Sequence, residues 1–93
     1  MKPLSFKLKV TDEVALFLGD LHPSLKRKIK AALKILISTP EAGKALRDEL
    51  AGLWSFRVSR FRIIYRSKRR TIEIIAIGPR DRIYEETYRL IKK

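Results

Sequence analysis

Four side chains in the second half of the chain are of types that combine phosphate binding with proton transfer: Arg57, Arg62, Arg80 and Tyr84. Arginine presents a planar, permanently charged fork that matches phosphate oxygens, so grouped arginines can grip a nucleic-acid backbone and stabilise charge on a reacting phosphate. Tyrosine can stack on a base or exchange a proton. These parts suit RNA cleavage by attack of a 2′-hydroxyl on its adjacent phosphate. An unperturbed arginine is a poor proton acceptor, so the substrate or its surroundings must help to position the reactants.

Strand pairing is expected to bring two of these arginines together. Residues 53–84 read LWSFRVSRFRIIYRSKRRTIEIIAIGPRDRIY, and their alternation predicts three successive strands. The shortest hairpin turn sets Arg57 opposite Arg62 and Trp54 opposite Tyr65. Like charges directly opposite each other destabilise a sheet, so a bound polyanion would explain the pair. The alternative is that arginine stems lie over a solvated sheet face with their charged groups in water.

The same alternation gives the predicted sheet two chemically different faces. A reversal over residues 67–70 would place the third strand beside an apolar row formed by Trp54, Phe56, Val58, Phe61, Ile63, Tyr65, Ile72, Ile74 and Ala76. The other face carries Ser55, Arg57, Arg60, Arg62 and Arg66, with Glu73 as the one acidic neighbour. We expect this second face to be open to solvent or to a partner.

Amphipathic patterns before residue 53 predict a strand and two helices. Residues 4–10 alternate as in a half-buried strand. Thr11 is expected to cap a first helix, and Ser24 a second helix that runs to about Ile37. The first helix would direct Val14, Leu16, Phe17 and Leu18 toward the core, and the second Leu25, Ile29, Ala32, Leu33 and Leu36. Residues 44–52 are expected to form a turn and an irregular connection.

A final short helix capped by Asp81 completes the predicted order of strand, two helices, three strands and helix. This order predicts an α+β fold in a single domain, residues 1–93, with a small, twisted, mainly antiparallel sheet packed on an N-terminal helical hairpin. The expected core contains Phe6, Leu8, Phe17, Ile29, Leu33, Trp54, Phe56, Ile63 and Ile74.

The composition narrows the possible partners and excludes several kinds of site. The 93 residues include 22 Lys and Arg against 10 Asp and Glu, a net charge of +12, which favours nucleic acid or an acidic protein as partner. Cysteine is absent, so disulfides and thiolate metal sites are excluded. His22, the one histidine, precedes Pro23 and is expected in a turn, and no Gly-rich phosphate loop occurs. We recognise no secretory signal or membrane span and expect a cytoplasmic protein without metal or cofactor.

Two stretches together resemble the RelE/ParE superfamily of toxins from bacterial and archaeal toxin–antitoxin pairs: LWSFRVSRFRIIY at 53–65 and IGPRDRIY at 77–84. The family pattern is a hydrophobic residue, Arg-Val, a short polar turn, a strand reading aromatic-Arg-hydrophobic-hydrophobic-Tyr, a hydrophobic strand, and Gly-X-Arg followed by Tyr or His. The resemblance covers essentially the whole chain. It implies a RelE-like fold and, for the RelE branch, an endoribonuclease (mRNA interferase) that cuts messenger RNA in the ribosomal A site.

The resemblance also implies roles for residues at matching positions. Arg62 and Arg80 would bind phosphate and stabilise the transition state, and Arg57 or Tyr84 would help to activate the 2′-hydroxyl, unless Tyr84 instead stacks on a base. The wider RNA-binding surface would include Ser55, Arg60, Arg82, Lys30 and Lys34, although the two lysines could simply keep their helix soluble. This chain departs from the family at Ser55, where some RelE relatives have a second lysine, and at the acidic pair Asp48-Glu49, which stands in a connection that is often lysine-rich.

Partners follow from the same resemblance. An acidic antitoxin would wrap the basic domain in a heteromeric complex and fold as it binds, with the C-terminal helix a candidate for displacement. Messenger RNA and the ribosome, near the 16S rRNA of the A site, would be the other partners. The main alternative is the ParE branch, whose members poison DNA gyrase without enzymatic activity. A plain RNA-binding module is a third reading, which the leading strand and helix pair fit poorly.

Overall fold

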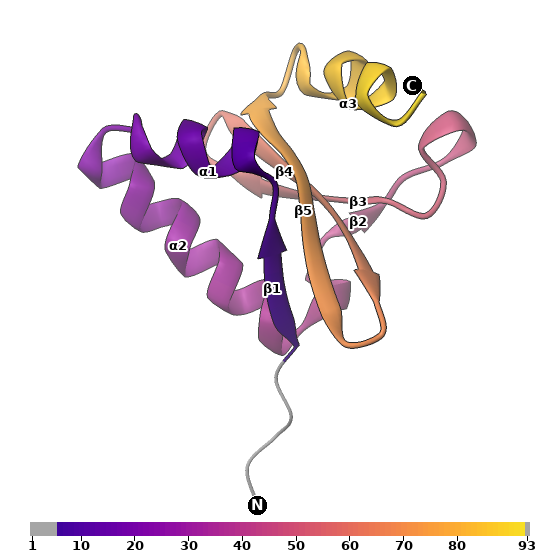
Figure 1. Cartoon of the computed structure of the whole chain (residues 1–93), viewed down its shortest axis with the longest axis horizontal. Helices are drawn as coiled ribbons and strands as arrows, with labels where there is room; N and C mark the ends of the chain where they lie inside the picture. Colours follow the sequence, from indigo (N-terminus) through magenta and orange to yellow (C-terminus); the bar gives the residue numbers. More distant parts are fainter. Residues whose placement is uncertain (1–5, 93) are drawn as a thin grey trace, which may run out of the picture.

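A computed structural model describes residues 6–92, so the predictions for residues 4 and 5 lie outside the described part of the chain. The helices and longer strands are β1 (Lys7–Val10), α1 (Asp12–Gly19), α2 (Pro23–Ser38), β2 (Lys44–Ala45), β3 (Trp54–Val58), β4 (Phe61–Lys68), β5 (Thr71–Pro79) and α3 (Ile83–Ile91). Five strands form one sheet in the order β1-β5-β4-β3-β2, in which β1 runs parallel to β5 and the other pairs are antiparallel (Figure 1). The predicted α+β fold is confirmed, and the two-residue β2 lies in the segment that was expected to be irregular.

The predicted hairpin register between β3 and β4 is confirmed. Arg57 pairs with Arg62 and Trp54 with Tyr65, across a two-residue turn. The next turn is tighter than predicted, because Lys68 already pairs with Thr71. Its two turn residues, Arg69 and Arg70, have φ of 49° and 62°, the left-handed conformation that a type I′ hairpin turn requires.

The helix pair α1 and α2 covers one face of the sheet (Figure 1). Helix α2 buries the predicted stripe of Ile29, Ala32, Leu33 and Leu36 against Val58, Ile63, Tyr65, Ile72, Ile74 and Ile77 of the sheet. Thr11 caps α1 as predicted, since its Oγ1 accepts a hydrogen bond from the backbone N–H of Val14 at 3.1 Å. The cap of α2 is His22 rather than Ser24, because His22 Nδ1 accepts from the Ser24 backbone N–H and Pro23 occupies the first helical position.

An irregularity in the pairing of β4 with β5 changes which side chains reach the main core. Ile64 pairs with Ala76 and Tyr65 with Ile74, so Ile75 is left as the extra residue of a bulge. Beyond the bulge the alternation of β5 is reversed, and Ile77 joins the main core instead of Ala76. The expectation that Ala76 belongs to the main apolar row was therefore wrong, because a regular period of two does not anticipate an inserted residue.

The opposite face of the sheet carries a second, smaller core. Leu53, Ile64 and Ala76 are buried there against Ile83 of α3, which lies across the end of β5 (Figure 1). The expected open face is thus closed over part of its area. Asp81 does not cap α3, whose N-cap residue is Arg82 and makes no side-chain capping bond.

Two residues expected in the core are exposed. Leu16 on α1 is 71% exposed, because this short helix buries only Val14 fully, and Leu8 is 43% exposed because β1 is an edge strand. Within residues 6–92, no helix combines the length and apolar character needed to cross a lipid bilayer.

Candidate functional site

Three arginines meet where the β3–β4 hairpin lies beside the end of β5. Arg57 and Arg62 are directly opposite each other, and Arg62 in turn pairs with Gly78 of β5. The backbone N–H of Arg80 donates to the carbonyl of Arg60 in the hairpin turn at 3.1 Å, which fixes the segment after β5 against that turn. The sequence prediction that Arg80 emerges beside the hairpin is therefore confirmed.

These three arginines form the shared wall of two adjoining hollows. The first is lined by Arg57, Ser59, Arg60, Arg62, Pro79, Arg80, Asp81 and Arg82. The second is lined by Ala42, Gly43, Lys44, Ser55, Phe56, Arg57, Arg62, Arg80 and Tyr84. We call the pair of hollows the arginine groove. It brings together all four predicted catalytic residues, and Arg60 and Arg82 lie at one end of it.

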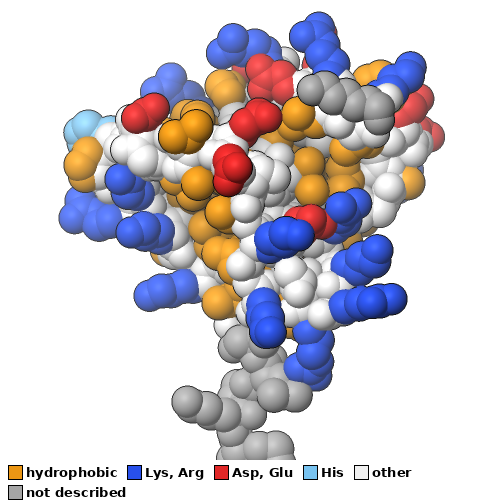
Figure 2. Space-filling model, viewed as in Figure 1, with side chains coloured by type: hydrophobic (Ala, Val, Ile, Leu, Met, Phe, Trp, Pro, Cys, Tyr) orange, Lys and Arg blue, Asp and Glu red, His pale blue; other side chains and the backbone are white. Residues whose placement is uncertain are grey.

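The arginine groove carries uncompensated positive charge. Among residues 6–92, the ion pairs join Lys9 and Arg66 to Glu73, and Arg89 to Glu85, so none involves Arg57, Arg62 or Arg80. Asp81 contributes one carboxylate to the wall of the first hollow without an ion pair. Figure 2 shows Lys and Arg side chains distributed over much of one view of the surface, in keeping with the net charge of +12. A polyanion would relieve the repulsion between arginines that face each other without acidic partners.

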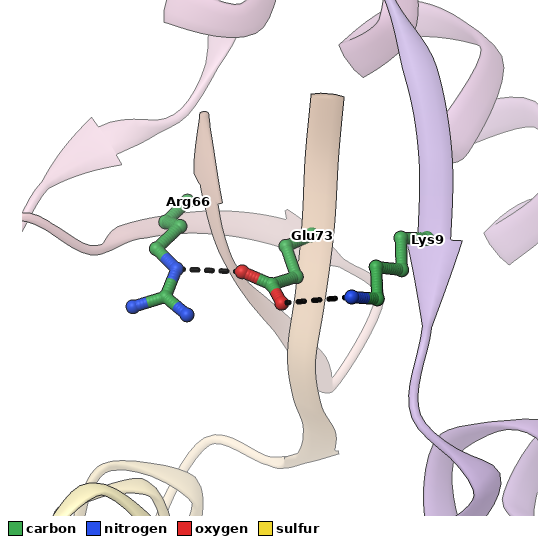
Figure 3. Close-up of polar contacts among 3 residues, drawn as sticks. All are labelled: Lys9, Arg66 and Glu73. Carbon is green, nitrogen blue, oxygen red and sulfur yellow. Dashed lines mark hydrogen bonds and ion pairs between the residues drawn. The ribbon is translucent and has the colours of Figure 1, made fainter. Parts of the chain in front are cut away.

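Arg66 differs from the other arginines on the same sheet face. Its Nε lies 2.6 Å from one oxygen of Glu73, and Lys9 Nζ lies 3.9 Å from the other oxygen (Figure 3). The hydrogen bond from Arg66 is the main reason that the pKa of Glu73 is lowered. Arg66 is therefore paired within the fold, and the polyanion-binding part of this face is confined to the arginine groove.

Tyr84 enters the groove from the first turn of α3. Its hydroxyl lies 3.1 Å from the hydroxyl of Ser55 on β3, while its ring packs on the second core formed by Leu53, Ile64, Ala76 and Ile83. Ser55 is only 7% exposed. The expectation of Ser55 as an open RNA contact is therefore corrected, because α3 covers it and its hydroxyl is engaged with Tyr84.

Two predicted RNA-binding residues lie away from the arginine groove. Lys30 and Lys34 are exposed on α2, which packs on the opposite face of the sheet from Arg57 and Arg62. The structure therefore does not join them to the groove, and they fit the alternative that they keep the helix soluble.

One groove residue was missed by the sequence reading. Lys44 begins β2 and pairs with Ser55, which sets it on the groove face of the sheet. Its strand is two residues long, too short to show an alternating pattern, so the sequence carried no signal for it. Within residues 6–92, no group of three or more His, Asp or Glu side chains is placed to hold a metal ion.

Comparison with solved structures gives the class of protein that this fold defines. A chain of the RelBE2 toxin–antitoxin complex from Mycobacterium tuberculosis is 29% identical, with 82% of this chain and 99% of that chain covered and a TM-score of 0.72. A mutant of Escherichia coli RelE in the free state is 20% identical, covered over 95% and 96% of the two chains, with a TM-score of 0.73. The archaeal RelE–RelB complex from Pyrococcus horikoshii OT3 contains a chain 24% identical, with coverages of 84% and 98% and a TM-score of 0.69. The fold is that of the RelE-like toxins.

The family assignment follows from the sequence of the same region. Residues 9–84 match the family described as ParE toxin of type II toxin-antitoxin system, parDE. The chain belongs to this family, and it is a type II toxin of the RelE/ParE superfamily, in the RelE-like branch. Comparison with curated proteins gives no match.

Proposed function

We propose that this toxin is an endoribonuclease that cleaves messenger RNA in the ribosomal A site. The observation that carries the proposal is the arginine groove, in which Arg57, Arg62 and Arg80 line one surface with Tyr84 and have no acidic partner. In this reaction the 2′ oxygen attacks the adjacent phosphorus and the bond to the 5′ oxygen of the next nucleotide breaks. Arg62 and Arg80 bind the phosphate and stabilise the negative charge that accumulates on it.

Tyr84 and Arg57 lie at the nucleophile side of the proposed reaction. The Tyr84 hydroxyl is held by Ser55, so it has a defined position from which to orient the 2′-hydroxyl or to stack its ring on a base. Arg57, opposite Arg62, adds charge that favours ionisation of that hydroxyl. The ribosome supplies the remaining alignment of the message, which is consistent with a site that lacks a histidine or a carboxylate base.

The proposal includes its partners and its compartment. The toxin acts on translating ribosomes in the cytoplasm and is neutralised by an acidic antitoxin that folds on its basic surface and competes with RNA for the arginine groove. Support comes from the net charge of +12 and from the similar chains that are known in RelB-containing complexes. Mixing the toxin with its antitoxin should therefore abolish cleavage and protect Arg57, Arg62 and Arg80 from arginine-specific chemical modification.

A translation reaction with purified toxin tests the activity. Message ends are read by primer extension in the presence and absence of translating ribosomes, for the wild type, Arg62→Ala, Arg80→Ala and the control Lys34→Ala. We expect cuts within codons that require ribosomes, that fall about 100-fold or more in both arginine variants, and that persist in the control, because Lys34 lies on the opposite face. Intact messages at saturating toxin would contradict the proposal.

The second candidate is inhibition of DNA gyrase, which the ParE description of the matching family favours. A supercoiling assay with the same preparations distinguishes the two functions. Intact messages together with loss of gyrase supercoiling would assign the toxin to gyrase, whereas cleaved messages with normal supercoiling assign it to RNA.

A further inference from the structure

Lys44 occupies a defined place in the arginine groove. Lys44 and Ser55 are opposite each other in the antiparallel pair β2–β3, and opposite residues project to the same face of a sheet. Lys44 therefore shares the face of Arg57 and lines the same hollow as Tyr84. Among residues 6–92 it makes no ion pair within 4.0 Å.

The backbone that carries Lys44 is held on both sides. Immediately before it, the N–H of Gly43 donates to the hydroxyl of Tyr65 at 3.0 Å, and the same hydroxyl donates to the carbonyl of Pro40 at 2.7 Å. Just after β2, the N–H of Leu46 donates to the carbonyl of Leu53 at 2.9 Å. Tyr65 is fully buried, so the start of β2 is anchored to the core of the protein. Lys44 thus extends from a fixed strand rather than from a loose loop.

The proposed reaction needs a proton donor that the arginines do not provide. When the bond between phosphorus and the 5′ oxygen breaks, that oxygen must gain a proton to leave as a hydroxyl group. Arginine does not release its proton in proteins, and the hollow around Lys44 contains no histidine or carboxylate. Only Lys44 and Tyr84 in this hollow can transfer a proton, and the Tyr84 hydroxyl is engaged with Ser55. A lysine ammonium group is a donor at neutral pH.

We infer that Lys44 is a further catalytic residue, the general acid that protonates the departing 5′ oxygen. The inference rests on the proposed RNA cleavage and assigns a step within it. The bond from the 2′ oxygen to phosphorus forms as the bond from phosphorus to the 5′ oxygen breaks. The 2′-hydroxyl proton passes to water, and the Lys44 ammonium gives its proton to the 5′ oxygen and is later reprotonated from water. The products are a 2′,3′-cyclic phosphate and a 5′-hydroxyl end.

Substitution at Lys44 separates proton donation from simple charge. Lys44→Ala is expected to slow single-turnover cleavage on ribosomes by about 100-fold, the usual contribution of a positioned general acid. Lys44→Arg keeps the charge but cannot release a proton, so it should remain at least tenfold slower than the wild type. Lys30→Ala, on the opposite face, is the matched control and should leave the rate unchanged. Thermal unfolding of each variant checks that the fold is kept.

A modified message gives the decisive measurement. When the 5′ oxygen at the cut position is replaced by sulfur, the thiolate leaves without needing a proton. The deficit of Lys44→Ala should then shrink to less than threefold, whereas that of Arg62→Ala should persist because phosphate binding is still lost. Full activity of Lys44→Arg on the normal message, or an unchanged Lys44→Ala deficit on the sulfur message, would overturn the role of Lys44. Absence of cleavage by the wild type on both messages would instead overturn the proposed function.

Discussion

The hydroxyl of Ser55 on β3 lies 3.1 Å from the hydroxyl of Tyr84 on α3, although the two residues are 29 positions apart. Ser55 is buried beneath α3, and Tyr84 is half-buried at the edge of the arginine groove. The contact therefore links the position of α3 to the geometry of the candidate site. It makes Ser55 a residue that positions Tyr84 rather than one that contacts RNA.

This contact predicts that Ser55 and Tyr84 act as a unit. Ser55→Ala should slow cleavage by about 2- to 10-fold, the value of one hydrogen bond that orients a hydroxyl group. Tyr84→Phe should slow it at least as much, and the double variant should be no slower than Tyr84→Phe alone. Single-turnover cleavage on ribosomes measures all three, with Ser67→Ala on the exposed part of β4 as control. Additive losses in the double variant would show that the two hydroxyls act independently.

The facing arginines predict a trade between stability and function. Arg57→Gln should raise the free energy of unfolding by about 0.2 to 1 kcal/mol, because it removes a like charge directly opposite Arg62. The same change should lower cleavage. Arg66→Gln is the matched control, since it removes a charge that is paired with Glu73 and should not stabilise the fold. Urea unfolding at low ionic strength measures both variants, and equal stabilisation by the two would contradict the repulsion at Arg57.

The buried hydroxyl of Tyr65 predicts a stability loss at alkaline pH. Burial raises the pKa of Tyr65 above its ordinary value of 10.0. Because the folded state holds the proton more tightly than the unfolded state, this contribution is fully present below pH 10 and is lost as the pH rises through the folded pKa. Tyr65→Phe removes the titrating group, so its unfolding free energy should fall less steeply above pH 10 than that of the wild type. A series of urea unfolding curves from pH 8 to 11 tests this, and identical slopes would contradict it.

At neutral pH the same substitution should be destabilising. Tyr65→Phe leaves the Gly43 N–H and the Pro40 carbonyl without their partner, at a cost of about 1 to 3 kcal/mol. Tyr88→Phe is the control, because that hydroxyl bonds only to the exposed side chain of Lys92. A loss of similar size in the control would mean that the anchoring of the segment before β2 contributes nothing special.

Close packing at Gly43 predicts a contrast between two glycines. A Cβ at Gly43 would lie 2.5 Å from the Tyr65 hydroxyl and 2.8 Å from the carbonyl oxygen of Ser55. Gly43→Ala should therefore destabilise the protein by about 1 to 3 kcal/mol and weaken cleavage through displacement of Lys44. Gly19→Ala, where a Cβ meets nothing within 4 Å, should be neutral or stabilising. Denaturant midpoints compare the two, and equal effects would contradict the crowding at Gly43.

The local sequence determined much of the fold and part of the site. The turn after Val58 and the regular alternation on both sides of it were sufficient to predict that Arg57 faces Arg62, and helical spacing was sufficient for the buried stripe of α2. These features depend on neighbours along the chain, where steric rules and periodicity apply directly.

Tertiary structure decided the features that depend on distant segments. The bulge at Ile75 exchanged Ala76 for Ile77 in the main core, and α3 covered Ser55 and brought Tyr84 to it. The two-residue β2 brought Lys44 into the arginine groove. Lys30 and Lys34, which looked equivalent to other basic residues in the sequence, were separated from the groove by the thickness of the sheet. Such placements result from how layers pack against one another, and no pattern within a single segment encodes them.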